Sequence, residues 1–186
     1  MSVMSPVLMT VAEFMNRPQP ADGSKEELVR GRIVKMPPTK AEHGIVQLEV
    51  GSRLLLYVKT HRLGWVVTES GAVTEPDTVR GPDVAFYSID DYPTRPTGYF
   101  HQPARLIVEV LSPSDRANRT LRKVNEYLTA GVRLVWVVDP EDKVVLVHQL
   151  GKQASEVVEG QNLDGYDVLP GFSLPLVELF ACTPTA

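Results

Sequence analysis

Two short apolar runs, on either side of a polar helical segment, dominate the hydrophobic pattern of this chain. Leu106–Leu111 (LIVEVL) is aliphatic except for one glutamate, and Val132–Val138 (VRLVWVV) is apolar except for one arginine. Short apolar runs rich in β-branched residues predict strands that are buried on both faces. Between them, Ser114 or Asp115 can cap a helix, and Gly131 is typical of a residue just past a helix C-terminus. The order predicts a strand–helix–strand unit.

The rest of the chain alternates between helical and strand patterns. Thr10 and Glu13 have the spacing of a capping box for a short helix. Lys40–His61 carries the longest helical pattern, with a predicted apolar stripe of Ile45, Leu48, Leu55 and Val58. Strands or hairpins are predicted for Glu27–Met36, Trp65–Thr68, Ala72–Glu75, Pro82–Tyr87, Lys143–Gln149 and Ser155–Val158. Together these elements predict a mixed α/β fold, with a central sheet flanked by helices.

Composition narrows the class of protein further. A chain of 186 residues is long enough for one domain with a full core, predicted over residues 10–182 after a flexible leader of residues 1–9. The single cysteine, Cys182, excludes an internal disulfide framework and a multi-cysteine zinc site. The net charge of −4 argues against a dedicated nucleic-acid scaffold but leaves room for a local basic patch. No apolar run approaches the ~18 residues of a membrane span, and the N-terminus lacks a signal-peptide pattern. We therefore expect a cytoplasmic protein.

Glu109 is the first candidate for chemistry, because it is the only charged residue in its apolar run. Burying an unpaired carboxylate costs several kcal/mol, so a cation, a metal ion or a proton is expected beside it. An acid at the end of a central strand, where the chain switches to a helix, lies where open α/β sheets place their chemistry. The alternative is a structural pairing with a nearby arginine. The residue type leaves both possibilities open.

Asp83 is a second carboxylate at the end of a predicted strand. It follows Pro82 and precedes an apolar segment, and it lies 26 residues before Glu109, which is enough for two neighbouring strands joined by a loop. Two carboxylates brought together in this way repel one another unless a divalent cation neutralises them, and oxygen-only ligation suits Mg²⁺ or Mn²⁺. Metal-assisted phosphodiester hydrolysis uses this arrangement together with a lysine or a second base. The alternative is that Asp83 is a turn residue after Gly-Pro.

The predicted helix after Glu109 is the most basic element of the chain. Arg116, Arg119 and Arg122 make it a candidate surface for phosphates. Lys123 shares a helix face with Arg119 and Tyr127, and periodicity alone predicts that its amine is exposed to solvent.

Two further residues are ambiguous on the pattern alone. Glu27 is expected to be exposed, and His43, in the first turn of the long helix, is either a cap-region residue, a donor near a metal, or without a role.

Six segments in this order resemble a large bacterial family described as putative restriction endonucleases, formerly a domain of unknown function. The family is placed in the PD-(D/E)XK nuclease superfamily. The resemblance covers roughly Thr10 to Phe180. The segments are Glu27–Val34 (ELVRGRIV), His43, Gly81–Val84 (GPDV), Leu106–Asp115 (LIVEVLSPSD), Lys123 with Glu126-Tyr127, and Ala130–Pro140 (AGVRLVWVVDP).

The resemblance implies a restriction-endonuclease-like fold and a role for each matching residue. Asp83 and Glu109 would hold Mg²⁺ or Mn²⁺ together with the backbone carbonyl of Val110. The lysine that the superfamily usually carries two residues after the second acid falls on Leu111, so this sequence departs from the pattern. The resemblance implies that Lys123 supplies the amine instead. Glu27 would be a further metal or water ligand and His43 a supporting donor.

Three functions agree with these residues. The first is a metal-dependent endonuclease that hydrolyses DNA, and the family resemblance adds the expectation of a homodimer. The second is a non-catalytic nucleic-acid-binding or regulatory protein that retains the nuclease fold. The third is a metal-dependent hydrolase of another phosphoester. Metal binding separates the second function from the other two, and the substrate separates the first from the third.

Overall fold

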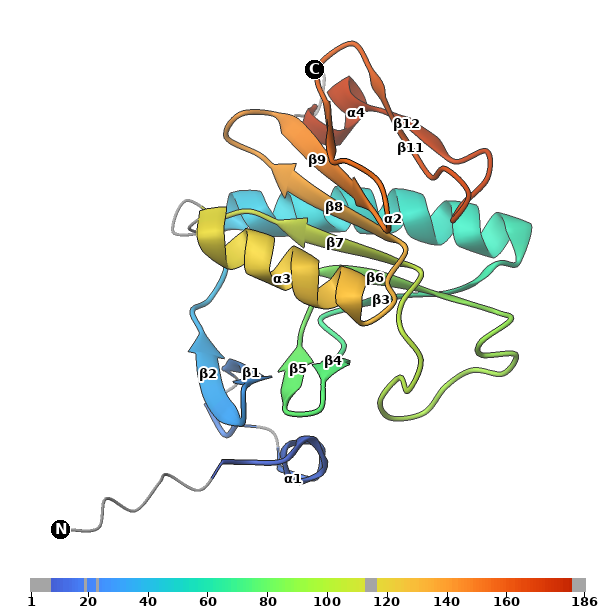
Figure 1. Cartoon of the computed structure of the whole chain (residues 1–186). Coiled ribbons are helices and arrows are strands. Elements are labelled where there is room, and N and C mark those ends of the chain that lie inside the picture. Colours follow the sequence, from blue (N-terminus) through green and yellow to red (C-terminus); the bar gives the residue numbers. More distant parts are fainter. Residues whose placement is uncertain (1–7, 19, 23, 113–116, 182–186) are drawn as a thin grey trace, which may run out of the picture.

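A six-stranded mixed β-sheet forms the centre of the computed structural model, which describes residues 8–181 apart from 19, 23 and 113–116 (Figure 1). β7 (Leu106–Val110) and β8 (Leu134–Asp139) run parallel to each other in the middle of the sheet. The other pairs described in this sheet are antiparallel. The strand order is β10-β9-β8-β7-β6-β3, with β3 at Gly64–Thr68, β6 at Val84–Ser88, β9 at Val144–Gln149 and β10 at Ser155–Val157.

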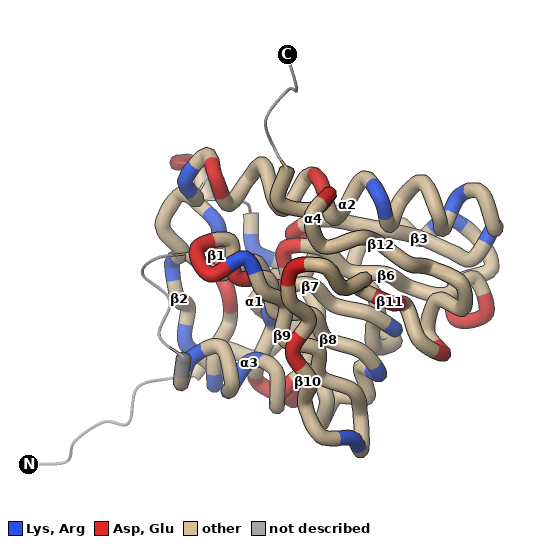
Figure 2. The backbone as a smooth tube through the Cα atoms, turned by 90° about the horizontal axis from the view of Figure 1, so that it is seen from above, with Lys and Arg blue, Asp and Glu red and all other residues tan. Residues whose placement is uncertain are grey.

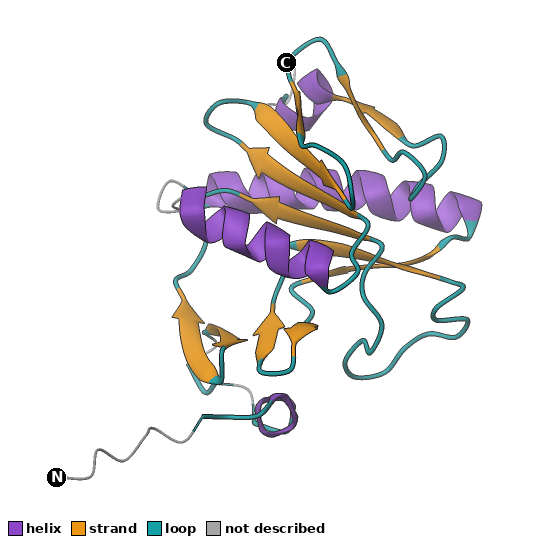
Figure 3. Cartoon of the chain, in the orientation of Figure 1, coloured by secondary structure: helices purple, strands orange, loops and turns teal. Residues whose placement is uncertain are grey.

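Two long helices cover opposite faces of this sheet, as Figures 1 and 3 show. They are α2 (Ala41–His61) and α3 (Ala117–Thr129). Side chains alternate between the two faces along a strand. Val108 of β7 therefore packs in the same core as Leu54 of α2, whereas Ile107 packs on the other face with Val124 of α3. Because α3 connects the two parallel strands, the predicted strand–helix–strand unit and the mixed α/β class are confirmed.

A smaller four-stranded antiparallel sheet lies beside the central sheet, in the order β2-β1-β5-β4 (Figure 1). Its strands are β1 (Lys25–Val29), β2 (Arg32–Met36), β4 (Ala72–Glu75) and β5 (Thr78–Arg80). Arg30 and Gly31 join β1 to β2, and both have positive φ angles, of 51° and 70°. Two consecutive left-handed residues give the tight turn that matches the twist of a hairpin. Of the two possibilities left open for Glu27–Met36, a strand or a hairpin, the structure shows the hairpin.

The remaining elements lie at the two ends of the chain. They are α1 (Val11–Met15), β11 (Asn162–Asp164), β12 (Ser173–Pro175) and α4 (Leu176–Phe180). At α1 the predicted capping box is formed, because the Thr10 side chain accepts from the Glu13 backbone and the Glu13 side chain accepts from the Thr10 backbone. No helix in the described part of the chain is long and apolar enough to cross a membrane.

The predicted apolar stripe of α2 is wrong for three of its four residues. Val58 is buried, but Ile45, Leu48 and Leu55 are exposed, with Leu48 71% exposed. The face that packs on the sheet instead carries His43, Val46, Val50, Gly51, Leu54 and Val58. Because α2 has aliphatic residues on two sides, hydrophobic periodicity does not identify which side faces the core. An apolar strip therefore remains on the outer surface of α2.

Candidate active site

The central sheet, the small sheet and both long helices bring five buried ionisable side chains together. These are Glu27 from β1, His43 from α2, Asp83 just before β6, Glu109 from β7 and Lys123 from α3. Each is between 2% and 8% exposed. In the antiparallel pairing of β6 with β7, Val84 lies opposite Val108, and one further step places Asp83 beside Glu109. The pairing thus brings two carboxylates from adjoining strands to the same end of the sheet.

Glu109 is held by two donors from α3. Lys123 Nζ lies 3.0 Å from Glu109 Oε2, and the Tyr127 hydroxyl donates to Glu109 Oε1 at 2.5 Å. Lys123 and Tyr127 are four residues apart, which places them on one face of the helix. Lys123 Nζ also lies 3.3 Å from Glu27 Oε1, so the amine bridges two carboxylates.

Asp83 is anchored by the backbone of the neighbouring strand and by two basic side chains. The backbone N–H of Val110 donates to Asp83 Oδ2 at 2.7 Å. His43 Nε2 lies 3.3 Å from the same oxygen, and Lys25 Nζ lies 3.8 Å from Asp83 Oδ1. The N-terminal part of α2 is fixed against this segment, because the Gln47 side chain donates to the backbone carbonyl of Asp83 at 2.9 Å.

A second buried ion-pair network continues behind Lys123. Arg80 donates through Nε and Nη2 to the two oxygens of Glu126, at 2.7 and 3.0 Å, and through Nη1 to Glu27 Oε2 at 2.9 Å. Glu27 Oε1 also accepts from the backbone N–H of Gly81 at 3.1 Å. The planar guanidinium is suited to paired carboxylates because its donors have a fixed fork geometry. Glu27 therefore links the Arg80 network to Lys123 and Glu109.

The environment shifts the pKa of both strand carboxyls, in opposite directions. Burial raises the pKa of Glu109, the Asp83 charge adds to this effect, and Lys123 opposes it. Burial also acts to raise the pKa of Asp83, but His43, the Val110 N–H and Lys25 outweigh it, so the Asp83 pKa is lowered. Two neighbouring carboxyls whose pKa values move apart are common at sites of acid–base or metal chemistry.

Lys123 and Tyr127 both remain protonated near neutral pH. Burial acts to lower the pKa of Lys123, but Glu109 and Glu27 outweigh it and raise the pKa above its usual value. Burial, reinforced by Glu109, raises the pKa of the Tyr127 hydroxyl well above its usual value. Both groups are therefore hydrogen-bond donors, and Lys123 is a fixed positive charge rather than a base.

The carboxylates border a cavity of about 260 Å³ between the start of α2, the end of β7 and α3. Asp83, Glu109, His43 and Lys123 contribute to its lining together with Arg119. Four carboxylates in this region (Glu27, Asp83, Glu109 and Glu126) face four basic side chains (Lys25, His43, Arg80 and Lys123). The buried charges in and behind the cavity therefore compensate one another without a bound ligand.

Comparison with protein-family models identifies the relatives of this chain. Residues 11–177 match the model named Uma2, described as "Putative restriction endonuclease". The chain belongs to this family. Among solved structures, a protein from Anabaena variabilis ATCC 29413, described as a "putative nuclease belonging to DUF820", has the same fold with a TM-score of 0.81. The two are 21% identical, and the match covers 94% of this chain and 98% of that one. Comparison with curated proteins gave no match.

Within this Uma2-family chain, two predictions of exposure were wrong. Periodicity on α3 predicted that the Lys123 amine is exposed, and the strand pattern predicted the same for Glu27, but both side chains are buried. Each is buried because it forms ion pairs across the sheets, which hydrophobic periodicity does not detect. Leu111, where the resemblance to PD-(D/E)XK nucleases leads one to expect a lysine, is half-buried. Lys123 of α3 donates to the Glu109 carboxylate at 3.0 Å.

The predicted arginines of α3 divide between two places. Arg119 is exposed and lines the cavity beside the carboxylates. Arg122 is also exposed, but it lines a different cavity on the other side of α3. Arg116 lies outside the described residues, as do the proposed cap residues Ser114 and Asp115.

Sequence reasoning gave no role to three charged residues of this region. Arg80 and Glu126 form the second network, and Lys25 lies near Asp83. Arg80 had one visible signal, since it is a lone cation between Val79 and the Gly-Pro pair in TVRGPDV. Glu126 follows Lys123 by three residues and so shares its side of the helix. Among the residues that the structure describes, no three His, Cys, Asp or Glu side chains form a metal-binding group.

Proposed function

We propose that this Uma2-family chain is a metal-dependent endonuclease of the PD-(D/E)XK type that hydrolyses DNA phosphodiester bonds. The observation that carries the proposal is the placement of Asp83 and Glu109 at the same end of adjoining strands, with the Lys123 amine 3.0 Å from Glu109. These are the two acids and the amine that this class of reaction needs. The lysine comes from a helix instead of the second strand. This accounts for the leucine at position 111, where the superfamily usually has its lysine.

The residues present fit a hard divalent cation. Asp83, Glu109 and the backbone carbonyl of Val110 offer oxygen donors only, which suits Mg²⁺ or Mn²⁺. When bound, such an ion lowers the pKa of a coordinated water and offsets charge on the scissile phosphate. An ion here competes with His43 and Lys123 for the oxygens of Asp83 and Glu109, because these basic groups neutralise the carboxylates in its absence.

The remaining residues position the reacting groups and neutralise charge. Lys123, protonated and hydrogen-bonded to Glu109, orients the attacking water or offsets the charge that develops on the phosphate. Tyr127 fixes the orientation of Glu109 through its hydroxyl, and Glu27 holds the Lys123 amine in place. His43 beside Asp83 acts as a supporting donor.

The proposal is tested by cleavage of plasmid and single-stranded DNA with Mg²⁺ or Mn²⁺. We expect cleavage by the wild-type protein with either ion and none after chelation. Asp83→Ala protein purified in parallel controls for contaminating nuclease, and it should be inactive. Absence of cleavage with every divalent metal would overturn the proposal. Hydrolysis of a small phosphodiester without cleavage of DNA would instead indicate a hydrolase of another phosphoester.

A non-catalytic binding or regulatory role is the second candidate, and one observation favours it. Asp83, Glu109, Glu27 and Glu126 are all paired with basic side chains, so the site is compensated without a metal ion. In a protein that has kept the fold but lost the reaction, these ion pairs alone would stabilise the buried carboxylates. Such a protein would bind DNA without cleaving it and would bind no divalent metal at this site.

We further propose that the chain forms a homodimer through the outer face of α2. Leu48 and Leu56 are exposed and lie at equal distances on either side of Ser52, a small residue that allows close approach. Glu42 and Arg62 are also equidistant from Ser52, at opposite ends of the helix. Two antiparallel copies crossing at Ser52 would therefore pair leucine with leucine and acid with base. This self-complementarity is what a two-fold interface requires.

Leu48→Glu is expected to convert the dimer to a monomer, because it places a charge in the apolar centre of the interface. Sedimentation equilibrium should give twice the 20.6 kDa chain mass for the wild type and the chain mass for the variant. Leu150→Glu, at a leucine that is 51% exposed after β9, is the matched control and should stay dimeric. A monomeric wild type, or a dimeric Leu48→Glu, would show that α2 is not the interface.

A further inference from the structure

A second cavity, of about 520 Å³, lies on the other side of α3 from Asp83. One wall is formed by α3, and the other by the small sheet, through Arg30 in the β1–β2 turn and Glu75 at the end of β4. Figure 2 shows Lys and Arg positions along both β2 and α3. None of the exposed residues of this groove has a role in the reaction proposed above.

The wall formed by α3 presents an uninterrupted polar stripe. Asn118, Arg122, Asn125 and Thr129 are all exposed and line the groove, and their spacing of four, three and four residues places them on one face of the helix. Leu121, which is 48% exposed, borders this stripe. The stripe contains two amides, one guanidinium and one hydroxyl, and no acid. These side chains can donate hydrogen bonds to phosphate, sugar and base edges.

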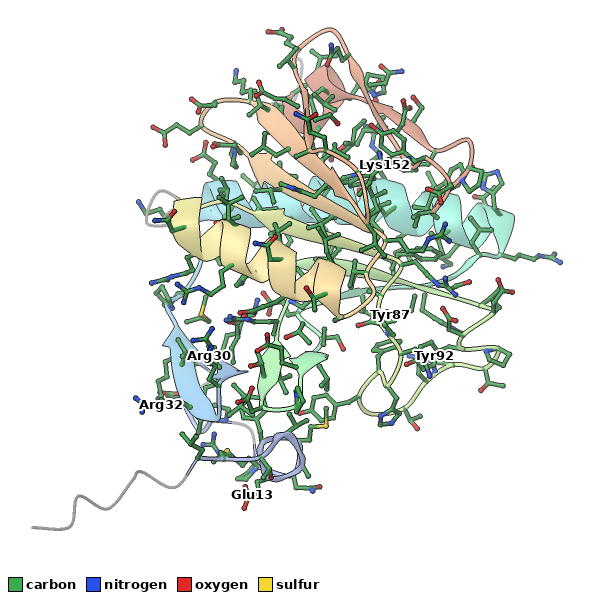
Figure 4. The ribbon with its side chains drawn as sticks, viewed as in Figure 1. Glu13, Arg30, Arg32, Tyr87, Tyr92 and Lys152 are labelled. Carbon is green, nitrogen blue, oxygen red and sulfur yellow. The ribbon has the colours of Figure 1, made fainter. Side chains whose placement is uncertain are left out.

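The opposite wall adds a second cation. Arg30 is exposed, and its backbone is fixed, because its N–H donates to the Thr78 hydroxyl at 3.2 Å. Figure 4 labels Arg30 on the hairpin beside α3. Within the described part of the chain, neither Arg30 nor Arg122 lies in an ion pair. Both guanidinium groups are therefore available to an anionic ligand.

Two carboxylates also border the groove. Glu126 is buried and neutralised by Nε and Nη2 of Arg80, and it belongs to the network that leads through Glu27 to Lys123. Glu75 is half-buried and accepts a long hydrogen bond of 3.4 Å from Thr78. Glu75 is therefore the carboxylate in this groove that would repel an anion. The Glu126 network therefore connects the wall of this groove, through Arg80 and Glu27, to Lys123 of the candidate active site on the other side of α3.

We propose that this groove binds the DNA strand that flanks the scissile phosphate, with Arg30 and Arg122 as phosphate ligands. This inference rests on the nuclease function proposed above. The polar stripe from Asn118 to Thr129 extends ~16 Å at ~1.5 Å per residue. A B-form strand carries one phosphate per ~3.4 Å of helix axis, so the groove spans about five phosphates. Asn118 and Asn125 contact sugars or base edges, and Leu121 offers an apolar contact to a sugar or a base.

Binding is measured by fluorescence anisotropy of a labelled oligonucleotide in a chelator, where cleavage does not occur. Arg122→Glu and Arg30→Glu should each weaken binding about tenfold and reduce the slope of log K against log salt by about 0.9. Glu75→Gln should strengthen binding, because it removes the repelling carboxylate. Lys152→Glu is the matched control, since Lys152 is exposed and lies well away from Arg30 (Figure 4), and it should bind like the wild type.

A small phosphodiester, bis(4-nitrophenyl) phosphate, separates this inference from the proposed function. It needs no flanking groove, so the ratio of DNA cleavage to small-ester hydrolysis should fall about tenfold in Arg122→Glu and Arg30→Glu. Unchanged binding and an unchanged ratio in both variants would overturn the groove and leave the nuclease function standing. If the wild type binds DNA through these arginines but hydrolyses neither substrate, the nuclease function is overturned and the groove stands as a DNA-binding site. Circular dichroism checks that each surface variant is folded.

Discussion

Glu109→Gln is expected to lower metal-dependent DNA cleavage by about 10³-fold while leaving the fold intact. The substitution removes one of the two negative charges that would hold the divalent ion. Metal stabilisation of the transition state contributes several kcal/mol, and each ~1.4 kcal/mol is tenfold in rate. Glutamine has nearly the shape of glutamate, and its carbonyl can still accept from Tyr127 in place of Glu109 Oε1.

Initial rates of plasmid nicking at saturating Mn²⁺ measure this effect. Glu156→Gln, which removes an exposed carboxylate on β10, is the control and should match the wild type. Thermal unfolding distinguishes loss of the site from loss of the fold. A Glu109→Gln protein that retains cleavage within a few-fold of the wild type would remove Glu109 from the reaction.

Arg80→Met is expected to lower the free energy of unfolding by about 3–5 kcal/mol, because it leaves buried carboxylates without their partner. Arg80 is buried and bonds to Glu126 through two nitrogens and to Glu27 through a third. Glu27 would keep Lys123 and the Gly81 N–H as partners. Glu126, which is buried on α3, would therefore bear most of the penalty.

Urea denaturation followed by circular dichroism measures the change. Arg105→Met is the matched control, because Arg105 also bonds a carboxylate through two nitrogens, on Asp91, but at a partly exposed position. Exposed ion pairs contribute about 0–1 kcal/mol, so this control should lose far less stability. Equal losses in the two variants would mean that the Arg80 network is not a buried, coupled unit.

The central part of the fold could be predicted from the sequence because its signals are local. Two apolar runs with a polar helical segment between them predict two strands joined by a helix, and β7, α3 and β8 form that unit with the strands parallel. The small sheet was predicted only in part, because β5 has three residues and its pairing with β1 is a long-range contact. The packed face of α2 was predicted wrongly because Ile45, Leu48 and Leu55 offer an equally apolar alternative face.

The candidate site shows the same division between local and long-range signals. Asp83 and Glu109 were predicted as neighbours because each lies at the end of a predicted strand and 26 residues separate them, and the pairing of β6 with β7 places them together. Lys123 was assigned to the site only by family resemblance, since helical periodicity predicted that it is exposed. Arg80 and Glu126 were not predicted, because they are 46 residues apart and their pairing depends on how two sheets and a helix pack.

Isothermal titration of Mg²⁺ and Mn²⁺ into the metal-free protein tests the central claim most directly, because the account requires Asp83 and Glu109 to hold a divalent ion. We predict binding of one ion per chain to the wild type and no binding to Asp83→Asn. Lack of binding to the wild type, or equal binding to Asp83→Asn, would contradict the account and favour the non-catalytic role.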